Sequence, residues 1–351
     1  MLDIIIPQYK ENDNDIKPLL DSIINQEGID FNLINICIVN DNSDTLLSKS
    51  FLENYNKLNI KYIRTKENRG PGLARQYGID NTFNKYIMFL DSDDELFDNK
   101  SLYAIFQFIK IKKPIYLVCN IAVEVYDKQN TKGLKIKKGK ETFPWMHGKV
   151  YDRSFLNAFN IRFSDKVRHL EDGYFTTCVI GSLKLNEISF LDYTVYRWKI
   201  NEKSLTRQIK EFNYSVMVFD DFFHTPFYAY DFLSKINSKY RYSYIVSAIF
   251  GIYIMLNSYI FSSNKLKEKR EYYLNLLEIE VMKKRNLFII IKHDDLIKLF
   301  ENEKKELLDR NNIKEVYKNV DDFINEYIKT KSSVCWAYFF KKKIYFYKNM
   351  W

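Results

Sequence analysis

The first hundred residues of the chain alternate short apolar runs with segments whose apolar residues recur at helical spacing. The runs are "LDIIIPQY", "LINICIVND", "IKYIRTK" and "KYIMFLD"; between them lie "DIKPLLDSIINQ", "SKSFLENYNKL" and a predicted helix from Leu73 to about Thr82. Apolar strands that alternate with helices are typical of a mainly parallel sheet with helices on both faces. Because such sheets bind ligands beyond the carboxyl ends of their strands, we expect the polar residues at those ends to meet in one crevice.

The overall composition is that of a folded, basic protein. Hydrophobic residues make up 46% of the 351 residues and charged residues 28%, and the net charge is +9 at pH 7. This composition excludes a disordered chain and favours a polyanionic partner, although a lysine-rich chain can also reflect biased base composition.

Cysteine spacing and the first residues indicate the compartment. The four cysteines have no C-x-x-C spacing, which predicts reduced thiols and a cytoplasmic protein. The opening "MLDIIIPQY" has no basic segment before its apolar run, so it predicts a first strand and not a signal peptide.

The pattern changes at about residue 208 to long helical segments rich in Lys, Tyr and Phe. We therefore predict a domain over 1–207, with halves 1–100 and 101–207, and a helical domain over 208–351 that serves acceptor binding or homo-oligomerisation. The uncharged stretch from Tyr242 to Ser263 contains enough Ser and Tyr to favour a buried or dimer-forming helix over a membrane span. The final "VCWAYFFKKKIYFYKNMW" suits a membrane interface, nucleic acid or simple packing.

Three carboxylates follow the strand that ends at Leu90: Asp91, Asp93 and Asp94. Carboxylates this close repel one another and lose hydration when they are buried, so folding alone gives little reason to place them there. Asp91 and Asp93 lie two residues apart, and both could reach one hard cation such as Mg²⁺ or Mn²⁺. An Asx-type turn followed by a helix cap is the alternative.

Five segments in order resemble the family 2 glycosyltransferases, which have the GT-A fold. They are "IIIPQYKEN", "IVNDNS", "NRGPGLARQYGI", "MFLDSDDELF" and "RHLEDGYF", and the resemblance covers roughly residues 1–207. It implies an α/β protein with a Rossmann-like, mainly parallel sheet flanked by helices. It also implies an inverting, metal-dependent enzyme whose donor is a nucleoside diphosphate sugar, with a UDP-sugar expected first.

The resemblance also implies a set of donor-binding residues. Asp41 would contact the uracil or ribose, with Asn42 where the family often has glycine, and Asp93 with Asp91 would hold the metal while Asp94 extends the acidic turn. Gly70 and Gly72 would permit close backbone approach. The donor-binding residues implied are Pro7, Tyr9, Glu11, Asp41, Asn68, Arg75, Asp91, Ser92, His147, Arg197, Lys199 and Arg207.

The "HLEDGYF" segment supplies the implied catalytic carboxylates. Asp172 matches the family's general base and Glu171 is its substitute. Taken alone, the same pair could simply be acidic residues at a helix N-terminus. Thr194 stands where the Q-x-x-R-W mark of processive synthases requires glutamine, so we expect a non-processive enzyme.

The sequence leaves the acceptor open. We expect a cell-surface glycan or a polyanionic polymer such as a teichoic acid, with hydroxylated or otherwise modified DNA as the alternative. Peripheral contact with the inner membrane face and a non-enzymatic role as a nucleotide-sugar-binding or membrane-associated scaffold are further alternatives. The coexistence of the "DSD" and "ED" motifs favours an enzyme.

Overall fold

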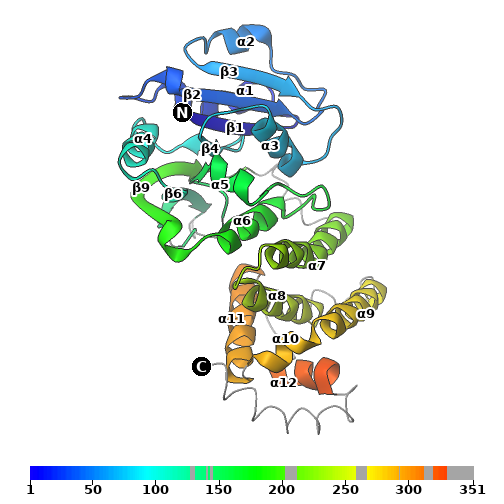
Figure 1. The fold of residues 1–351 in the computed structure, drawn as a ribbon. Coiled ribbons are helices and arrows are strands. Elements are labelled where there is room, and N and C mark those ends of the chain that lie inside the picture. Colours follow the sequence, from blue (N-terminus) through cyan, green and yellow to red (C-terminus); the bar gives the residue numbers. More distant parts are fainter. Residues whose placement is uncertain are drawn as a thin grey trace. The chain divides into compact units, whose positions relative to one another are not determined.

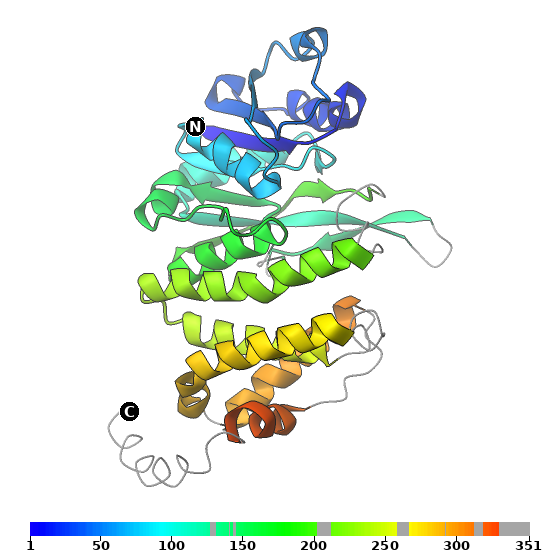
Figure 2. The same ribbon diagram turned by 90° about the vertical axis from the view of Figure 1, so that its right-hand side faces the viewer.

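The computed structural model describes residues 1–126, 131–139, 141–142, 145–201, 212–257, 267–291, 293–311 and 319–329. The chain divides into two compact units, Met1–Ser238 and Lys239–Trp351. The first unit extends past the predicted boundary at residue 207 because helix α7 (Phe212–Lys235) packs on α6 (Glu171–Ser182), beside which it lies in Figure 2. The Ser238 hydroxyl closes this contact by donating to the Gly181 carbonyl at 2.5 Å.

The described part of the first unit contains one nine-stranded sheet, in the order β3-β2-β1-β4-β8-β6-β9-β5, with β7 paired to β6 (Figure 1). The strands are β1 (Leu2–Gln8), β2 (Ile34–Asn40), β3 (Asn59–Arg64), β4 (Tyr86–Phe89), β5 (Glu95–Leu96), β6 (Tyr116–Tyr126), β7 (Lys132–Lys137), β8 (Lys149–Asp152) and β9 (Ile188–Trp198). β3, β2, β1 and β4 are parallel as predicted. β8 then runs antiparallel between β4 and β6, and β9 is again parallel to β6. The sheet is therefore mixed beyond its first four strands.

Helices cover both faces of the sheet, as the apolar strands predicted. Alternate residues of β1 show the two layers: Ile4 packs with α1 and α4, whereas Ile5 packs with α3, α5 and α6. The helical elements, besides α6 and α7, are α1 (Asp13–Ile24), η1 (Phe31–Leu33), α2 (Lys49–Glu53), α3 (Pro71–Asp80), α4 (Ser101–Lys112), α5 (Arg153–Ala158) and η2 (Leu185–Glu187). The three predicted helices of the first hundred residues correspond to α1, α2 and α3.

The second unit is helical, as predicted for the C-terminal region. Its elements are α8 (Arg241–Leu256), α9 (Lys267–Lys283), α10 (Arg285–Ile290), α11 (His293–Asn311), α12 (Val320–Phe323) and the π-helix η5 (Ile324–Lys329). Edge-to-face aromatic contacts form its core, with the Phe250 ring 5.3 Å from that of Phe300 and 5.1 Å from that of Phe323. None of the helices in the described ranges combines the length and the apolarity that crossing a membrane requires. The aromatic stretch from residue 334 to 351 lies outside the described residues.

Candidate active site

The carboxyl end of β4 leads into the acidic turn. Leu90 is fully buried, and the chain reverses so that the Asp94 N–H donates to the Asp91 carbonyl at 3.1 Å. One carboxylate oxygen of Asp91 accepts from Arg75 at 2.6 Å, and the other lies 3.0 Å from Nε2 of His147. Ser92, the residue between Asp91 and Asp93 in the sequence, is buried. The strand thus delivers Asp91 to a place where both of its carboxylate oxygens are engaged, one by Arg75 and one by His147.

A group of possible metal ligands forms around this turn. One donor atom each from Asp91, Asp94 and His147 lies within 4.8 Å of the others. The hydroxyl of Tyr196 donates to Asp94 at 2.5 Å and the Lys199 N–H donates to it at 2.8 Å. Asp93, predicted as a ligand with Asp91, instead accepts from the Asn201 side chain at 2.7 Å. Asp94, predicted only to extend the turn, is the carboxylate that joins Asp91.

The charges of this turn are unevenly balanced. Burial raises the pKa of Asp94 to about 8, with Asp91 and Asp93 adding to the shift. Burial also raises the pKa of Asp93. For Asp91 burial acts in the same direction, but Arg75 and His147 outweigh it and lower the pKa of that carboxyl. Asp94 and Asp93 therefore carry the electrostatic cost that a divalent cation would relieve.

Arg75 joins the acidic turn to the "ED" pair. It lies on α3, is 4% exposed, and donates from Nη1 to Glu171 at 2.9 Å and from Nη2 to Asp91 at 2.6 Å. Burial would lower the pKa of Arg75, but the two carboxylates outweigh it and raise the pKa. Residues 16 and 96 positions away in sequence thus meet at one guanidinium group.

Two glycines allow this approach. Gly70 has φ of +90°, a conformation that L side chains rarely adopt, and a Cβ on Gly72 would lie 2.6 Å from Cγ of Glu171. Gly72 thus leaves room for the side chain of Glu171, and the predicted close backbone approach at the donor site stays a prediction.

The "ED" pair opens helix α6. Burial raises the pKa of Glu171 to about 7, with Asp172 adding to the shift and Arg75 opposing it. Asp172 is half-buried and accepts a hydrogen bond from the Gly173 N–H at 2.7 Å. Glu171 is thus held by Arg75, whereas the Asp172 carboxylate is the more accessible of the two.

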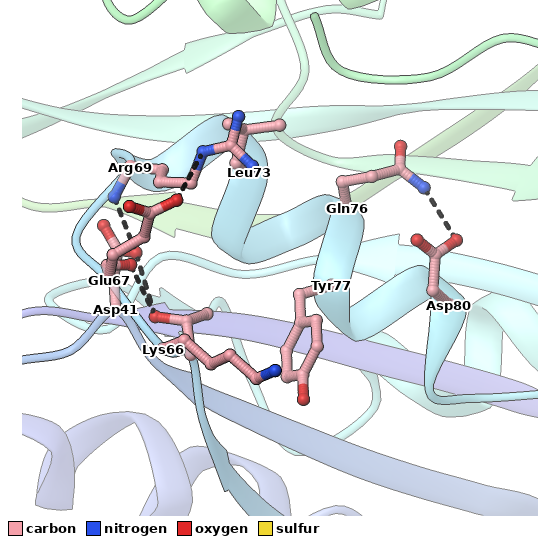
Figure 3. Close-up of a pocket in the computed structure, with 9 residues that line it drawn as sticks. Asp41, Lys66, Glu67, Arg69, Leu73, Gln76, Tyr77 and Asp80 are labelled. Atoms are coloured by element: carbon pink, nitrogen blue, oxygen red, sulfur yellow. Dashed lines mark hydrogen bonds and ion pairs between the residues drawn. The ribbon is translucent and has the colours of Figure 1, made fainter. Parts of the chain in front are cut away.

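A cavity of about 310 Å³ lies beside the Gly70 turn (Figure 3). Asp41 lies at its edge, where it accepts from the backbone N–H groups of Arg69 (3.1 Å) and Gly70 (2.7 Å). Asn42, which stands where the family often has glycine, has φ of 54°, a left-handed conformation that asparagine tolerates. The lining residues are Asp41, Thr65, Lys66, Glu67, Arg69, Leu73, Gln76, Tyr77 and Asp80.

The family model for glycosyl transferase family 2 matches residues 3–168. This part of the chain belongs to glycosyl transferase family 2. The structure of S. aureus TarS 1-349 in complex with UDP-GlcNAc superposes with a TM-score of 0.63 at 18% identity, covering 88% of each chain. The predicted GT-A fold is therefore confirmed.

Two relatives match over part of the chain. The uncharacterized glycosyltransferase YibD of Escherichia coli is 23% identical over 60% of this chain and 65% of its own length. The poly(ribitol-phosphate) beta-glucosyltransferase of Bacillus spizizenii is 29% identical over 56% of this chain and 32% of its own length. The chain thus spans less than two thirds of either relative.

The remaining predicted residues of this family 2 domain fall into three places. Pro7 is buried in β1, Tyr9 is 45% exposed just after it, and the Tyr9 N–H donates to Glu11 at 2.6 Å. Burial raises the pKa of Glu11, and nearby Asp93 contributes, so this segment lies near the acidic turn. The Asn68 amide donates to the Asp41 carbonyl at 3.2 Å, which places Asn68 at the Asp41 turn.

Of the predicted donor contacts Arg197, Lys199 and Arg207, Lys199 reaches the acidic turn through the hydrogen bond from its N–H to Asp94. Arg197 pairs with Glu124 at 2.7 Å, and Lys199 pairs with Glu95 at 2.6 Å. Arg207 lies outside the described residues. Their neighbours Tyr196 and Trp198, which sequence reasoning missed, contact His147 instead: the Trp198 ring stacks on the imidazole at 5.9 Å and 13°. Strand alternation was the available signal, because residues 196 and 198 share a face that excludes 197.

Proposed function

We propose that this chain is an inverting, non-processive glycosyltransferase that moves a sugar from a UDP-sugar to an acceptor hydroxyl. The observation that carries the proposal is the Arg75 bridge, with 2.6 Å to Asp91 and 2.9 Å to Glu171. It joins the strand-end Asp91 to Glu171 of the "ED" pair at one buried guanidinium, which a plain strand-turn-helix connection would not need. A binding scaffold would need the donor residues but not the "ED" pair.

The donor assignment draws on the fold and on the Asp41 turn. TarS, which shares the fold, has been solved with UDP and with UDP-GlcNAc. In this chain Asp41 and the cavity beside it would receive the nucleoside, with the diphosphate toward the acidic turn. Carboxylate acceptors suit the N–H and hydroxyl donors of uridine.

A divalent cation fits the acidic turn. Asp91 and Asp94 offer the carboxylate oxygens that Mn²⁺ and Mg²⁺ prefer, and His147 and Asp93 lie beside them. When bound, the ion supplies positive charge that offsets the charge of the departing diphosphate.

Asp172 is the proposed general base. Its carboxylate would take the proton of the acceptor hydroxyl, whose oxygen attacks the anomeric carbon from the face opposite the leaving nucleoside diphosphate. Glu171 keeps Arg75 in place and supports the turn. The pairing of Glu171 with Arg75 is what distinguishes the two carboxylates.

The proposed acceptor is a polyol-phosphate polymer. Two kinds of support exist: the net charge of +9 favours a polyanion, and the Bacillus spizizenii relative is named for transfer to poly(ribitol phosphate).

The test is a thermal-shift panel of UDP-, GDP-, CMP- and dTDP-sugars with and without Mn²⁺, followed by transfer assays on poly(ribitol phosphate). A ligand that binds only the folded state raises the apparent melting temperature. We expect a Mn²⁺-dependent shift with a UDP-sugar that Asp91→Asn abolishes, and comparison of Asp93→Asn with Asp94→Asn identifies the second ligand. Asp172→Asn should keep the shift while transfer collapses. Full transfer by Asp172→Asn would refute the assignment of the base, and absence of any donor shift would refute the donor class.

A further inference from the structure

Strand alternation sorts the residues around β6 onto two faces. In the register of β6 with its neighbours, Val123 pairs with Lys135 of β7 and with Trp198 of β9, and Ile121 pairs with Lys137 and Tyr196. Residues paired across neighbouring strands share a face. Lys135, Lys137, Tyr196 and Trp198 therefore lie on one face of the sheet.

This face is the one that carries His147. The His147 ring contacts both Tyr196 (5.1 Å between centroids) and Trp198 (5.9 Å), and a Cβ on Gly148 would meet the Ile121 side chain at 2.6 Å. His147 in turn contacts Asp91 of the acidic turn at 3.0 Å. One continuous face thus leads from the candidate metal group outward to β7.

The outer part of this face combines aromatic and basic side chains. Trp198 is 37% exposed and meets the half-buried Trp145 edge to face at 5.6 Å, and Lys135 is exposed. Lys137 is paired with Glu141 at 3.2 Å. Lys135 lies two strands from Trp198, about 10 Å at the usual strand spacing. We call Trp145, Trp198, Lys135 and Lys137 the Trp–Lys face.

The opposite face differs in charge. There Glu124 pairs with Arg197, and Leu134 and Ile136 of β7 are exposed. Lys132 of β7 also lies on that side, with its ammonium 5.9 Å from the Tyr126 ring centroid. Of the two lysines of β7 on the active-site face, Lys135 is exposed, whereas Lys137 is half-buried and paired with Glu141.

We propose that the Trp–Lys face binds the acceptor, a phosphodiester-linked polyol or glycan polymer. This inference rests on the proposed transferase function and assigns the acceptor to a surface. The tryptophan rings would pack on the carbon faces of a polyol or sugar unit, and the Lys135 ammonium would pair with a phosphodiester of the same chain. Charge complementarity and proximity to His147 select this occupant.

The experiment compares two matched single substitutions on β7. Lys135→Gln and Lys132→Gln remove the same charge from the same strand, but on opposite faces. With poly(ribitol phosphate) as acceptor, we expect Lys135→Gln to raise the KM for the polymer about threefold to fivefold, the upper part of the range for one exposed ion pair, and to weaken the salt dependence of that KM. Lys132→Gln should leave both unchanged.

Three results would overturn the proposal. One is an equal rise in the KM for the polymer in Lys135→Gln and Lys132→Gln, which would show that β7 acts only through its overall positive charge. Another is an unchanged KM in Lys135→Gln. The third is a single-stranded oligonucleotide that binds more tightly than the polymer with the same dependence on Lys135, which would assign this face to nucleic acid.

A failure of the proposed function itself can be recognised separately. If the wild-type protein shows neither a donor-dependent thermal shift nor transfer, the transferase proposal fails. Direct titration of the polymer, followed by tryptophan fluorescence in wild type, Lys135→Gln and Lys132→Gln, then still decides whether this face binds it. If Lys135→Gln binds the polymer more weakly than wild type and Lys132→Gln binds it equally well, the result supports polymer binding by the Trp–Lys face. Identical binding by all three proteins refutes it.

Discussion

One carboxylate oxygen of Asp221, on α7, accepts two hydrogen bonds from His169, one from its backbone N–H and one from its ring Nδ1, each 2.8 Å long. A carboxylate can only accept, so the Nδ1 atom carries the proton. His169 precedes Leu170, whose φ of 62° is unusual for a leucine, and Leu170 precedes the "ED" pair at the start of α6. Asp221 thus anchors the backbone that aims Asp172.

We predict that Asp221 acts as a positioning residue. Asp221→Ala should lower kcat for transfer about tenfold with little change in the KM for the donor. The reason is that the backbone before Asp172 would lose its anchor and the carboxylate its orientation, while the donor residues stay in place. Asp221→Asn should recover part of the rate, since an amide oxygen still accepts. Asp220→Ala on the same helix is the matched control. Loss of kcat in that control to the same extent would indicate a general effect on α7.

A second prediction concerns the packing of Gly72. Gly72→Ala should destabilise the protein by about 1–3 kcal/mol, because the new Cβ would lie 2.6 Å from Cγ and 2.8 Å from Cβ of Glu171. Gly173→Ala is the control, since its Cβ would meet nothing within 4 Å. That change should stabilise α6 by about 0.5–1 kcal/mol through helix propensity. Urea unfolding measures both, and equal effects in the same direction would contradict the predicted clash.

The pKa of Glu171 predicts a pH dependence of stability. In the folded state this pKa is raised to about 7 from 4.5 by burial, with Asp172 adding to the shift. Between these two values the folded state binds more protons than the unfolded state, so the Glu171 contribution to stability falls as pH rises. Glu171→Gln removes this dependence. Relative to wild type, the variant should therefore gain stability between pH 5 and 7, by at most about 1.4 kcal/mol per pH unit.

Denaturant unfolding of both proteins across this pH range provides the measurement. Asp172→Asn serves as the comparison, because it alters the neighbouring charge and leaves Glu171 able to titrate. A stability difference between Glu171→Gln and wild type that stays constant with pH would show that Glu171 titrates at its ordinary value.

The buried thiols supply a test of the core. Burial raises the pKa of Cys37 to about 11 and those of Cys119 and Cys178 to about 12. Because the thiolate is the reactive form, these three should resist maleimide at pH 8 in the folded protein and react after unfolding. Mass spectrometry of labelled peptides measures each site. Rapid labelling of Cys119 in native buffer would contradict its place in the sheet. Cys335 lies outside the described residues.

Parts of the fold and site were predictable because their signals are local. The four parallel strands follow from continuous apolar runs, and the turn at Asn42 follows from a residue type that tolerates the left-handed conformation. The position of Asp91 at a strand end follows from the same periodicity. These features depend on residues near one another in the chain, whose backbone geometry limits them to few conformations.

Contacts between distant residues could not be read in this way. The pairing of His147 with Asp91 depends on β8 inserting antiparallel beside β4, and the two residues lie 56 positions apart. The register of β9 on β6 likewise places Arg197 beside Glu124 and brings Tyr196 and Trp198 to His147, while the predicted donor contact of Arg197 stays a prediction.

The sequence by itself determined the strand and helix order of the first hundred residues, the acidic turn after β4 and the "ED" pair. Only the tertiary structure decided that Arg75 joins these two carboxylate groups. It also decided that Asp221 holds His169, two residues before the "ED" pair. The physical reason is that local periodicity reflects hydrogen bonds within each helix and between neighbouring strands. The contacts of Arg75 and Asp221 depend instead on how whole layers pack and on which charges must be paired once they are buried.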